Sequence, residues 1–395
     1  MKKYIPTKIS SYVGITVQAI VNNFLPILFI ALQDVYGLSY EKLAHIIAVN
    51  FITQIFTDCT TPKILKYLGY RYCAVMCQFT AAVGLAMLGI LPNVMSNTYS
   101  AILISVVVYA FGSGLMEVVL SPLVENLPSK NKKGSMAILH SFYCWGQAIT
   151  VLATTALFYV FGYDRWTYIP LIWATIPFIN MLSFFKVPII EPPADQKQDG
   201  LTRLLKMPKF RLYMVMMLCA GAAEIAMAEW SSLFAQQALG VSKVVGDLAG
   251  PCAFALFMGA GRLWYAAVSK RVSLKRVLIL LNIGAFICYI GVAFCKIGFL
   301  SLIFCAVCGF TVSISWPGIY SAGARDFPTG GAVMYSVFAM CGDTGCWLGP
   351  WILGLVADKL GLNLGFAAAS VFPVIMIISC IVMIKKDCKL KKKSI

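Results

Sequence analysis

Charged residues are scarce in this chain of 395 residues. Asp, Glu, Lys and Arg make up 12% of it and apolar residues 60%, whereas soluble proteins contain about 25% charged and about 45–50% apolar residues. So few charges cannot cover a surface in water, which excludes a cytosolic enzyme, a secreted disulfide scaffold and a disordered tail. The composition predicts a membrane protein with several transmembrane helices.

Motifs that carry catalytic chemistry are also lacking. The chain has two histidines and no Gly-x-Ser-x-Gly, His-Glu-x-x-His or phosphate-binding loop, so we expect no enzyme activity, no cofactor and no metal. Its 14 cysteines fall almost wholly in apolar segments, where cysteine serves as a small packing residue. Cys305 and Cys308 form a C-x-x-C pair, but no second pair completes a zinc site.

Long apolar runs, in contrast, recur along the whole chain. A helix that crosses the bilayer needs about 20 mostly apolar residues. This length predicts an all-α membrane protein with twelve transmembrane helices. They are expected at residues 10–33, 41–60, 72–92, 98–124, 135–160, 168–186, 210–235, 244–268, 277–295, 299–322, 330–356 and 364–384.

The net charge of +16 comes from short basic clusters between these apolar runs. Of the 32 Lys and Arg residues, 26 lie in the two termini and in the loops on the same side, and five lie in the opposite loops. This asymmetry predicts that both termini are cytoplasmic. Because the clusters follow the membrane topology, we expect them to face the lipid bilayer and not a nucleic acid.

A polar stretch at residues 187–209 separates the first six predicted helices from the last six. At an offset of 196 residues, Gly134 and Gly146 of the first half align with Gly330 and Gly342 of the second. This weak repeat favours two pseudo-symmetric six-helix bundles, the plan of many transporters. The predicted parts are an N-terminal bundle (1–186), a cytoplasmic linker (187–209), a C-terminal bundle (210–384) and a basic cytoplasmic tail (385–395).

Helices 4 and 5 carry a family resemblance. The runs GSGLMEVVLSPLVENLP and KKGSMAILHSFYCWGQ resemble the corresponding stretch of the fucose-type sugar/proton symporters, a branch of the major facilitator superfamily. The resemblance implies a secondary transporter whose two bundles expose a central site alternately to each side. The matching positions are Gly112, Glu117, Pro122, Phe142 and Gly146, with the paired Asn22 and Asn23 in helix 1 and Glu224 and Trp230 in helix 7.

Several positions depart from that branch. Its proton-coupling Asp of helix 1 falls on Pro26, and its sugar-binding Gln and Asn of helix 5 fall on His140 and Tyr143. The superfamily signature between helices 2 and 3 retains Gly69 and Arg71. The resemblance therefore implies a transporter of this architecture and leaves the solute open.

An ionisable group near the bilayer centre costs about 2.5–3.5 kcal/mol and is a functional candidate by default. Glu117 shares a helix face with Tyr109, Ser113 and Ser121. A carboxyl group in a partly dry cavity can take up and release a proton near neutral pH, so we interpret Glu117 as the proton-coupling residue. The alternative is a structural hydrogen bond between helices 4 and 5.

Four further ionisable groups lie at membrane depth. Asp343 in a glycine-rich part of helix 11 and Glu224 in helix 7 are the other proton-coupling candidates. Asp343 could instead pair permanently with Arg262 or Lys270. Arg262 in helix 8 fits a structural role that supports a gate better than it fits binding of an anionic solute. We assign Asp58 in helix 2 to the same structural class.

Uncharged polar and aromatic residues form stripes at helical spacing. Such groups could bind a sugar-like solute, although aromatic residues in membrane helices more often serve as packing or interface residues. One stripe holds Asn50, Gln54 and Asp58, another Gln18 and Asn22, and another Ser313, Trp316 and Tyr320. The substrate-binding candidates are Asn22, Asn23, His140, Tyr143, Gln147, Trp316 and Tyr320.

The sequence thus favours a monomeric transporter in the plasma membrane of a bacterium. We expect it to move a small polar organic solute by symport with protons, because no nucleotide-binding motif is present to drive a pump. One alternative is efflux of amphiphilic compounds or lipids by the same fold. A second is a membrane sensor or scaffold that transports nothing.

Overall fold

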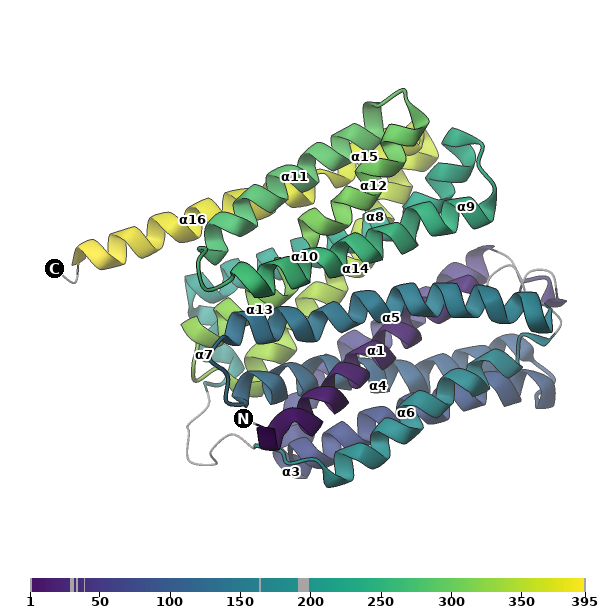
Figure 1. Cartoon of the computed structure of the whole chain (residues 1–395), viewed down its shortest axis with the longest axis horizontal. Coiled ribbons are helices and arrows are strands. Elements are labelled where there is room, and N and C mark those ends of the chain that lie inside the picture. The colour runs from purple at the N-terminus through teal and green to yellow at the C-terminus, as the bar shows by residue number, and fades with distance from the viewer. Residues whose placement is uncertain are drawn as a thin grey trace. The chain divides into compact units, whose positions relative to one another are not determined.

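The computed structural model describes residues 2–28, 32, 35–38, 40–162, 165–190 and 199–393, and these residues contain helices and no strand (Figure 1). The principal helices are α1 (Ile5–Ile27), α3 (Tyr40–Val94), α4 (Thr98–Asn126), α5 (Lys132–Phe161), α6 (Tyr168–Lys186), α7 (Leu201–Lys206), α8 (Pro208–Leu239), α9 (Lys243–Asp247), α10 (Ala253–Val268), α11 (Leu274–Phe294), α12 (Gly298–Val312), α13 (Ser315–Asp326), α14 (Gly331–Leu360), α15 (Leu362–Ala369) and α16 (Val371–Lys393). A short 3-10 helix, η1 (Lys2–Tyr4), precedes α1, and a π-helical turn, η3 (Leu248–Cys252), joins α9 to α10.

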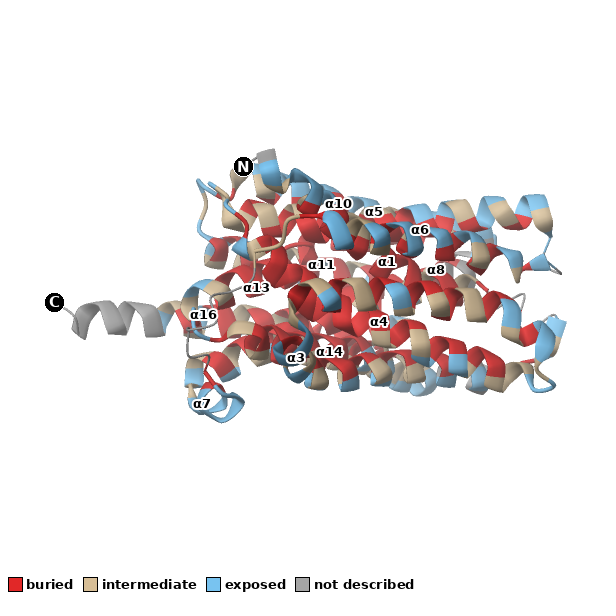
Figure 2. Cartoon of the chain, turned by 90° about the horizontal axis from the view of Figure 1, so that it is seen from below, coloured by how far each residue is buried: buried red, intermediate tan, exposed pale blue. Residues whose placement is uncertain are grey.

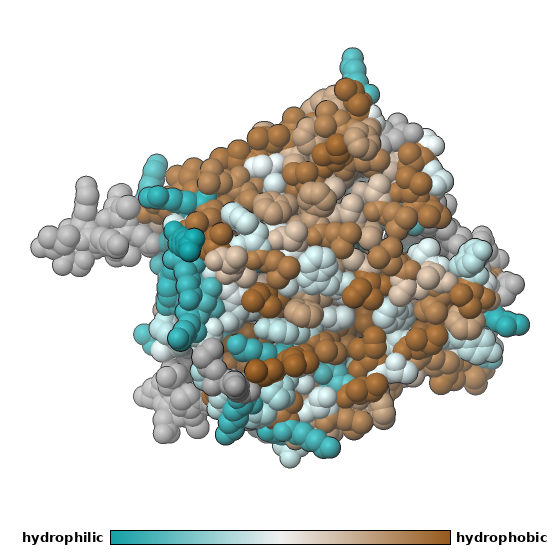
Figure 3. Space-filling model, viewed as in Figure 1, coloured by the Kyte–Doolittle hydropathy of each residue, from teal (hydrophilic) through white to brown (hydrophobic). Residues whose placement is uncertain are grey.

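Nine helical stretches of the described residues are long and apolar enough to cross a membrane. Two more of the predicted segments lie on α1 and α14, where polar and glycine residues lower the hydropathy. The two segments 41–60 and 72–92 both lie within α3. Side chains on the face shown in Figure 3 are mainly hydrophobic. The structure therefore confirms the all-α membrane fold.

Some predicted segments have different ends or are interrupted. The run 299–322 is two helices, α12 and α13, and the run 364–384 is divided between α15 and α16. In the first segment, 10–33, helix α1 ends at Ile27, and part of the remainder lies outside the described residues. Hydropathy reports which residues face lipid and is insensitive to such local breaks.

Two compact units make up the chain. Unit 1 contains Met1–Ser129 and Phe142–Gln196, and unit 2 contains Lys130–Ser141 and Lys197–Ile395. Helix α5 is therefore shared, because its first residues group with unit 2 and the rest with unit 1. Buried residues run through the middle of the helices of each unit (Figure 2).

A backbone break in α3 explains the two retained positions of the loop signature. Gly69 has φ 73° and ψ 168°, a region that only glycine adopts readily. Two residues later, Nη1 of Arg71 donates to the carbonyl oxygens of Phe184 (2.9 Å) and Phe185 (3.0 Å) at the end of α6. Carbonyls at a helix end have no partner within the helix, so Arg71 supplies donors that fix the end of α6 against α3.

Glycines let the helices of each unit approach closely. In unit 1, a Cβ atom at Gly112 of α4 would come within 2.6 Å of the Cys77 carbonyl oxygen of α3. In unit 2, a Cβ atom at Gly349 of α14 would come within 2.5 Å of the Ala222 carbonyl oxygen of α8. Small residues at membrane helix interfaces permit such backbone contact. These contacts hold the polar residues of α4 and α8 at fixed positions.

Candidate functional site

Glu117 of α4 is buried in unit 1, with 6% of its surface exposed. Its Oε2 accepts a hydrogen bond of 2.7 Å from Nε2 of Gln18 on α1. A glutamine amide can donate its NH₂ to an ionised carboxylate or, after rotation, present its oxygen to a protonated one. The Gln18 side chain can therefore hydrogen bond to the carboxyl group of Glu117 in both protonation states.

One turn along the same two helices, Asn22 is the centre of an amide cluster, which we define as Asn22, Asn50, Gln54 and Ser113. The Oδ1 atom of Asn22 accepts from Nε2 of Gln54 (3.0 Å), from Oγ of Ser113 (3.3 Å) and from Nδ2 of Asn50 (3.5 Å). The Ser113 hydroxyl is also 2.9 Å from Oε1 of Gln54. Because that hydroxyl has one proton, it donates to either Asn22 or Gln54 at any moment.

The hydrogen bond between Gln18 and Glu117 and the amide cluster around Asn22 form a continuous polar seam along α1 and α4. Gln18 and Asn22 are one turn apart on α1, and Ser113 and Glu117 are one turn apart on α4, so the pairs lie above each other. The seam joins α1, α3 and α4 of unit 1. The amide groups of the seam can both donate and accept hydrogen bonds.

Helix α5 contributes to unit 1 through its second part. Nδ2 of Asn23 lies 3.4 Å from the hydroxyl of Tyr143, which accepts its hydrogen bond. The rings of Tyr12 and Phe142 stack with centroids 4.6 Å apart. Gly146 faces α1, where a Cβ atom would come within 2.9 Å of Ala19. Gln147, the residue after Gly146, is also buried, so four of the helix 5 positions singled out in the sequence pack within unit 1.

Asp58 is also buried in unit 1 and lies one turn after Gln54 on α3. The predicted face that carries Asn50, Gln54 and Asp58 is therefore buried in the unit, and its first two residues contact Asn22.

In unit 2, Arg262 of α10 is buried, with 2% of its surface exposed. Its Nε donates to the carbonyl oxygen of Ser313 at 2.9 Å, and its Nη1 donates to the carbonyl oxygen of His140. In a continuous helix, the Ser313 carbonyl would accept from the amide of residue 317, but Pro317 has no N–H. The break between α12 and α13 thus leaves an acceptor that Arg262 satisfies.

The carboxylate that Arg262 contacts is that of Glu224 on α8. Its Oε2 lies 3.3 Å from Nη2 of Arg262, which also lies 3.4 Å from Sδ of Met258. The sequence suggested a fixed pair of Asp343 with Arg262 or Lys270, and the structure places Glu224 beside Arg262. Because each guanidinium nitrogen of Arg262 has a protein acceptor, this residue connects α5, α8, α10 and the α12–α13 break.

Aromatic rings gather beside this ion pair. The imidazole of His140 stacks on the ring of Tyr320 with centroids 5.7 Å apart, and Tyr320 stacks on Tyr335 at 5.4 Å. The ring of Trp316 lies 6.3 Å from that of Tyr320 and covers Gly342, where a Cβ atom would overlap with the indole. Asp343, the next residue of α14, is buried.

The three substrate-binding candidates of helix 5, His140, Tyr143 and Gln147, do not all belong to one unit. His140 groups with unit 2, where it contacts Tyr320, whereas Tyr143 and Gln147 group with unit 1. Helical spacing alone places them on similar faces, but it does not determine which neighbouring helices those faces meet.

A charged cluster at the end of α13 was not predicted. Oδ2 of Asp326 accepts from the Tyr213 hydroxyl (2.7 Å) and lies 2.8 Å from Nζ of Lys209, and Oδ1 lies 3.0 Å from Nε of Arg325. Charges at the ends of membrane helices are ordinary, so the sequence contains no signal for this cluster. Within the described residues, no group of three or more His, Cys, Asp or Glu side chains is arranged to hold a metal ion.

Comparisons with known proteins relate the chain to a family. The family model described as Major Facilitator Superfamily matches residues 11–350. A comparison with curated proteins gives no match.

Similar solved structures cover nearly the whole chain. FucP, a transporter in the outward conformation, has a TM-score of 0.80 and 18% identity, with 96% of this chain and 98% of that chain covered. A variant of the E. coli fucose:proton symporter FucP has a TM-score of 0.79 at the same identity and coverage. The human organic anion transporter MFSD10 (TETRAN) has a TM-score of 0.72 and 13% identity, with 95% and 99% covered. At these identities the likeness concerns the fold.

Proposed function

Because this chain belongs to the major facilitator superfamily, and is therefore a secondary transporter by family and fold, we propose that it takes up a small polar, sugar-like solute by symport with protons. Among proteins of similar fold, FucP is described as a fucose:proton symporter. That description supports the proposal without fixing the solute. We further propose alternating access, a monomer, cytoplasmic termini and the plasma membrane of a bacterium.

The observation that carries the proposal is the buried pair of Glu117 and Gln18. An ionised carboxylate at membrane depth is costly, and protonation removes that cost. We propose that Glu117 is protonated while the loaded transporter changes conformation and ionised when the proton is released. Rotation of the Gln18 amide keeps a hydrogen bond in both states.

Solute binding is proposed separately for each unit. In unit 1, the amides of Asn22 and Asn23, the hydroxyl of Tyr143 and the amide of Gln147 are groups that hydrogen bond to hydroxyls. In unit 2, we propose the rings of His140, Trp316 and Tyr320, because sugar-like solutes pack their apolar faces on aromatic rings.

The remaining charges receive different roles. Glu224 is paired with Arg262, so we propose that this pair supports the α12–α13 break and that it does not bind solute. Asp343 stays a second candidate for proton coupling, and Asp58 a structural charge. Each assignment follows from the position of the residue in its own unit.

A Glu117→Gln variant tests the coupling. In proteoliposomes that contain a pH-sensitive dye, the variant should lose uphill uptake and solute-dependent proton movement, while downhill exchange of solute across the membrane continues. The control is Asp358→Asn, an exposed carboxylate near the end of α14, which should behave like the wild type. Proton movement by Glu117→Gln at the wild-type rate would refute the coupling role.

The solute class can be found by thermal melting of the purified protein with sugars, nucleosides, organic acids and hydrophobic cations. A ligand at 100 times its Kd stabilises the native state by about 2.7 kcal/mol, which is readily measured. Stabilisation by sugars that depends on pH would support symport. Stabilisation only by hydrophobic cations or lipids would favour efflux, and no stabilisation by any class would favour a sensor or scaffold.

A further inference from the structure

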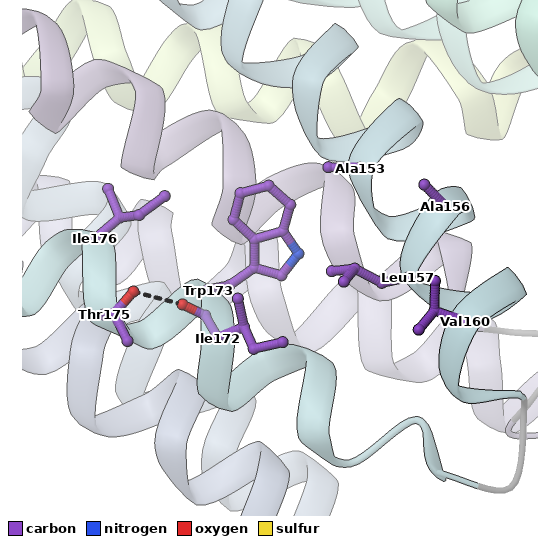
Figure 4. Close-up of a pocket in the computed structure, with 8 residues that line it drawn as sticks. All are labelled: Ala153, Ala156, Leu157, Val160, Ile172, Trp173, Thr175 and Ile176. Atoms are coloured by element: carbon purple, nitrogen blue, oxygen red, sulfur yellow. Dashed lines mark hydrogen bonds between the residues drawn. The ribbon is translucent and has the colours of Figure 1, made fainter.

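An apolar groove runs along α5 and α6 of unit 1 (Figure 4). Its volume is about 360 Å³. It lies apart from Glu117 and the amide cluster, so it has no part in the proposed transport site. The lining residues are Ala153, Ala156, Leu157 and Val160 of α5 and Ile172, Trp173, Thr175 and Ile176 of α6.

The groove exists because α5 presents small side chains where α6 presents an indole. Ala153 and Ala156 leave space, and Trp173 forms the floor. Nε1 of Trp173 donates to Oγ1 of Thr154 at 3.1 Å, so the polar atom of the indole is satisfied within the protein. The hydroxyl of Thr175 donates to the carbonyl of Ile172 at 2.7 Å. The groove therefore offers hydrocarbon to whatever occupies it.

The surroundings decide between water and lipid as the occupant. Both helices are apolar enough to cross the membrane, and the rim is open, since Val160 is 73% exposed and Ile172 is 42% exposed. A bound water needs about 2–4 polar partners, which this lining does not supply. An acyl chain of the bilayer, in contrast, gains from contact with apolar walls.

The connection of α5 and α6, which follows the last lining residue of α5, carries a positive charge. The lining residues reach the end of α5 and the beginning of α6, and Arg165, which is exposed, lies in the connection of these helices. The rings of Phe161 and Tyr168 approach there, with centroids 6.4 Å apart. Aromatic residues and arginine are typical of the level of the lipid headgroups, and a guanidinium pairs well with phosphate.

We propose that this groove binds one acyl chain of an anionic phospholipid, whose headgroup phosphate contacts Arg165. The acyl chain lies over Trp173 in the space left by Ala153 and Ala156. The groove gives affinity for the chain, and Arg165 gives preference for an anionic headgroup. This lipid is a resident of unit 1 and is distinct from any transported solute.

The experiment reconstitutes the full chain in vesicles of phosphatidylglycerol and phosphatidylcholine, extracts it into detergent and counts retained lipids by native mass spectrometry. Ala156→Leu fills the groove, and Arg165→Gln removes the charge while leaving the fold untouched. The matched controls are Thr155→Leu, an exposed neighbour on α5 outside the lining, and Lys296→Gln, an exposed cation in another connection.

We expect the wild type and both controls to retain one phosphatidylglycerol. Ala156→Leu should lower its retention at least about tenfold, as expected when about two buried methylene groups are displaced. Arg165→Gln should lower it about fivefold, which corresponds to about 1 kcal/mol of headgroup attraction. Equal retention by Ala156→Leu and Thr155→Leu would overturn the groove as the binding site. Equal retention of the two lipids by the wild type would overturn the role of Arg165.

Discussion

The ion pair of Glu224 and Arg262 allows a quantitative test of how unit 2 is held together. Replacement of Glu224 with leucine removes the carboxylate and leaves the guanidinium of Arg262 buried. Replacement of Arg262 with methionine keeps a long apolar side chain and removes the charge. The double variant removes both charges and keeps an approximate match in volume.

The magnitudes follow from the geometry. Loss of one partner from a buried ion pair costs about 3–5 kcal/mol. The separation of 3.3 Å between Glu224 and Arg262 is longer than the strongest charged hydrogen bonds, at about 2.7–2.9 Å, so Glu224→Leu should cost about 3 kcal/mol. Arg262→Met should cost more, because it also removes the donors to the carbonyl oxygens of Ser313 and His140. The double variant has no unpaired charge but loses the donors to the carbonyls of Ser313 and His140, which again costs about 3 kcal/mol.

The assay is unfolding of the purified protein by sodium dodecyl sulfate in mixed micelles, followed by circular dichroism. The free energy of unfolding is measured for the wild type, both single variants and the double variant. Glu229→Leu is the matched control, because this carboxylate lies on the same helix α8 but is exposed. The control should change the free energy by less than about 0.5 kcal/mol.

The decisive quantity is the coupling energy of the cycle. If the two side chains act as a pair, the double variant costs no more than either single variant, which is a coupling of at least about 3 kcal/mol. If the two single costs add in the double variant, the side chains do not act as a pair. If Glu224→Leu behaves like Glu229→Leu, the carboxylate does not stabilise the buried guanidinium.

Three smaller effects should be measurable in the same unfolding assay. Gly69→Ala should destabilise the protein by about 1–3 kcal/mol, because φ 73° and ψ 168° strain any residue with a Cβ atom, whereas Gly200→Ala, with open space around it, should be close to neutral. Gly345→Ala should cost about 1–3 kcal/mol, because its new methyl group would overlap with backbone atoms of α8. Tyr213→Phe should cost about 1.5 kcal/mol through loss of the 2.7 Å bond to Asp326; no change in any of these would contradict the corresponding contact.

Sequence reasoning predicted the helices well because the bilayer imposes their length and apolarity. It also identified the major facilitator superfamily correctly, since the resemblance in helices 4 and 5 agrees with a family match over residues 11–350. Gly69 and Arg71 stood out in the sequence as retained signature positions. Their physical reasons, a positive φ and a pair of carbonyl contacts on α6, became visible only with the structure.

The break between α12 and α13 shows where hydropathy reaches its limit. Residues 299–322 are mostly apolar and were predicted as one helix. Pro317 carries a local signal, because it removes the donor for the Ser313 carbonyl. That the missing donor comes from Arg262, 51 residues away, is a property of tertiary packing. The same holds for Glu224, which is 38 residues from Arg262.

The candidate site in unit 1 contains one residue that sequence reasoning could select and a partner that it could not. Glu117 could be selected from sequence because a carboxyl group at membrane depth is costly wherever its partner lies. Its partner Gln18 is 99 residues away, and no sequence periodicity relates the two positions, so the pair could not be predicted. With Pro26 at the position where the related symporters have an aspartate, α1 contributes amides to the polar seam. An amide can hydrogen bond to a carboxyl group in either protonation state but does not itself titrate, so under the proposed symport Glu117 is the residue of this seam of α1 and α4 that holds the proton.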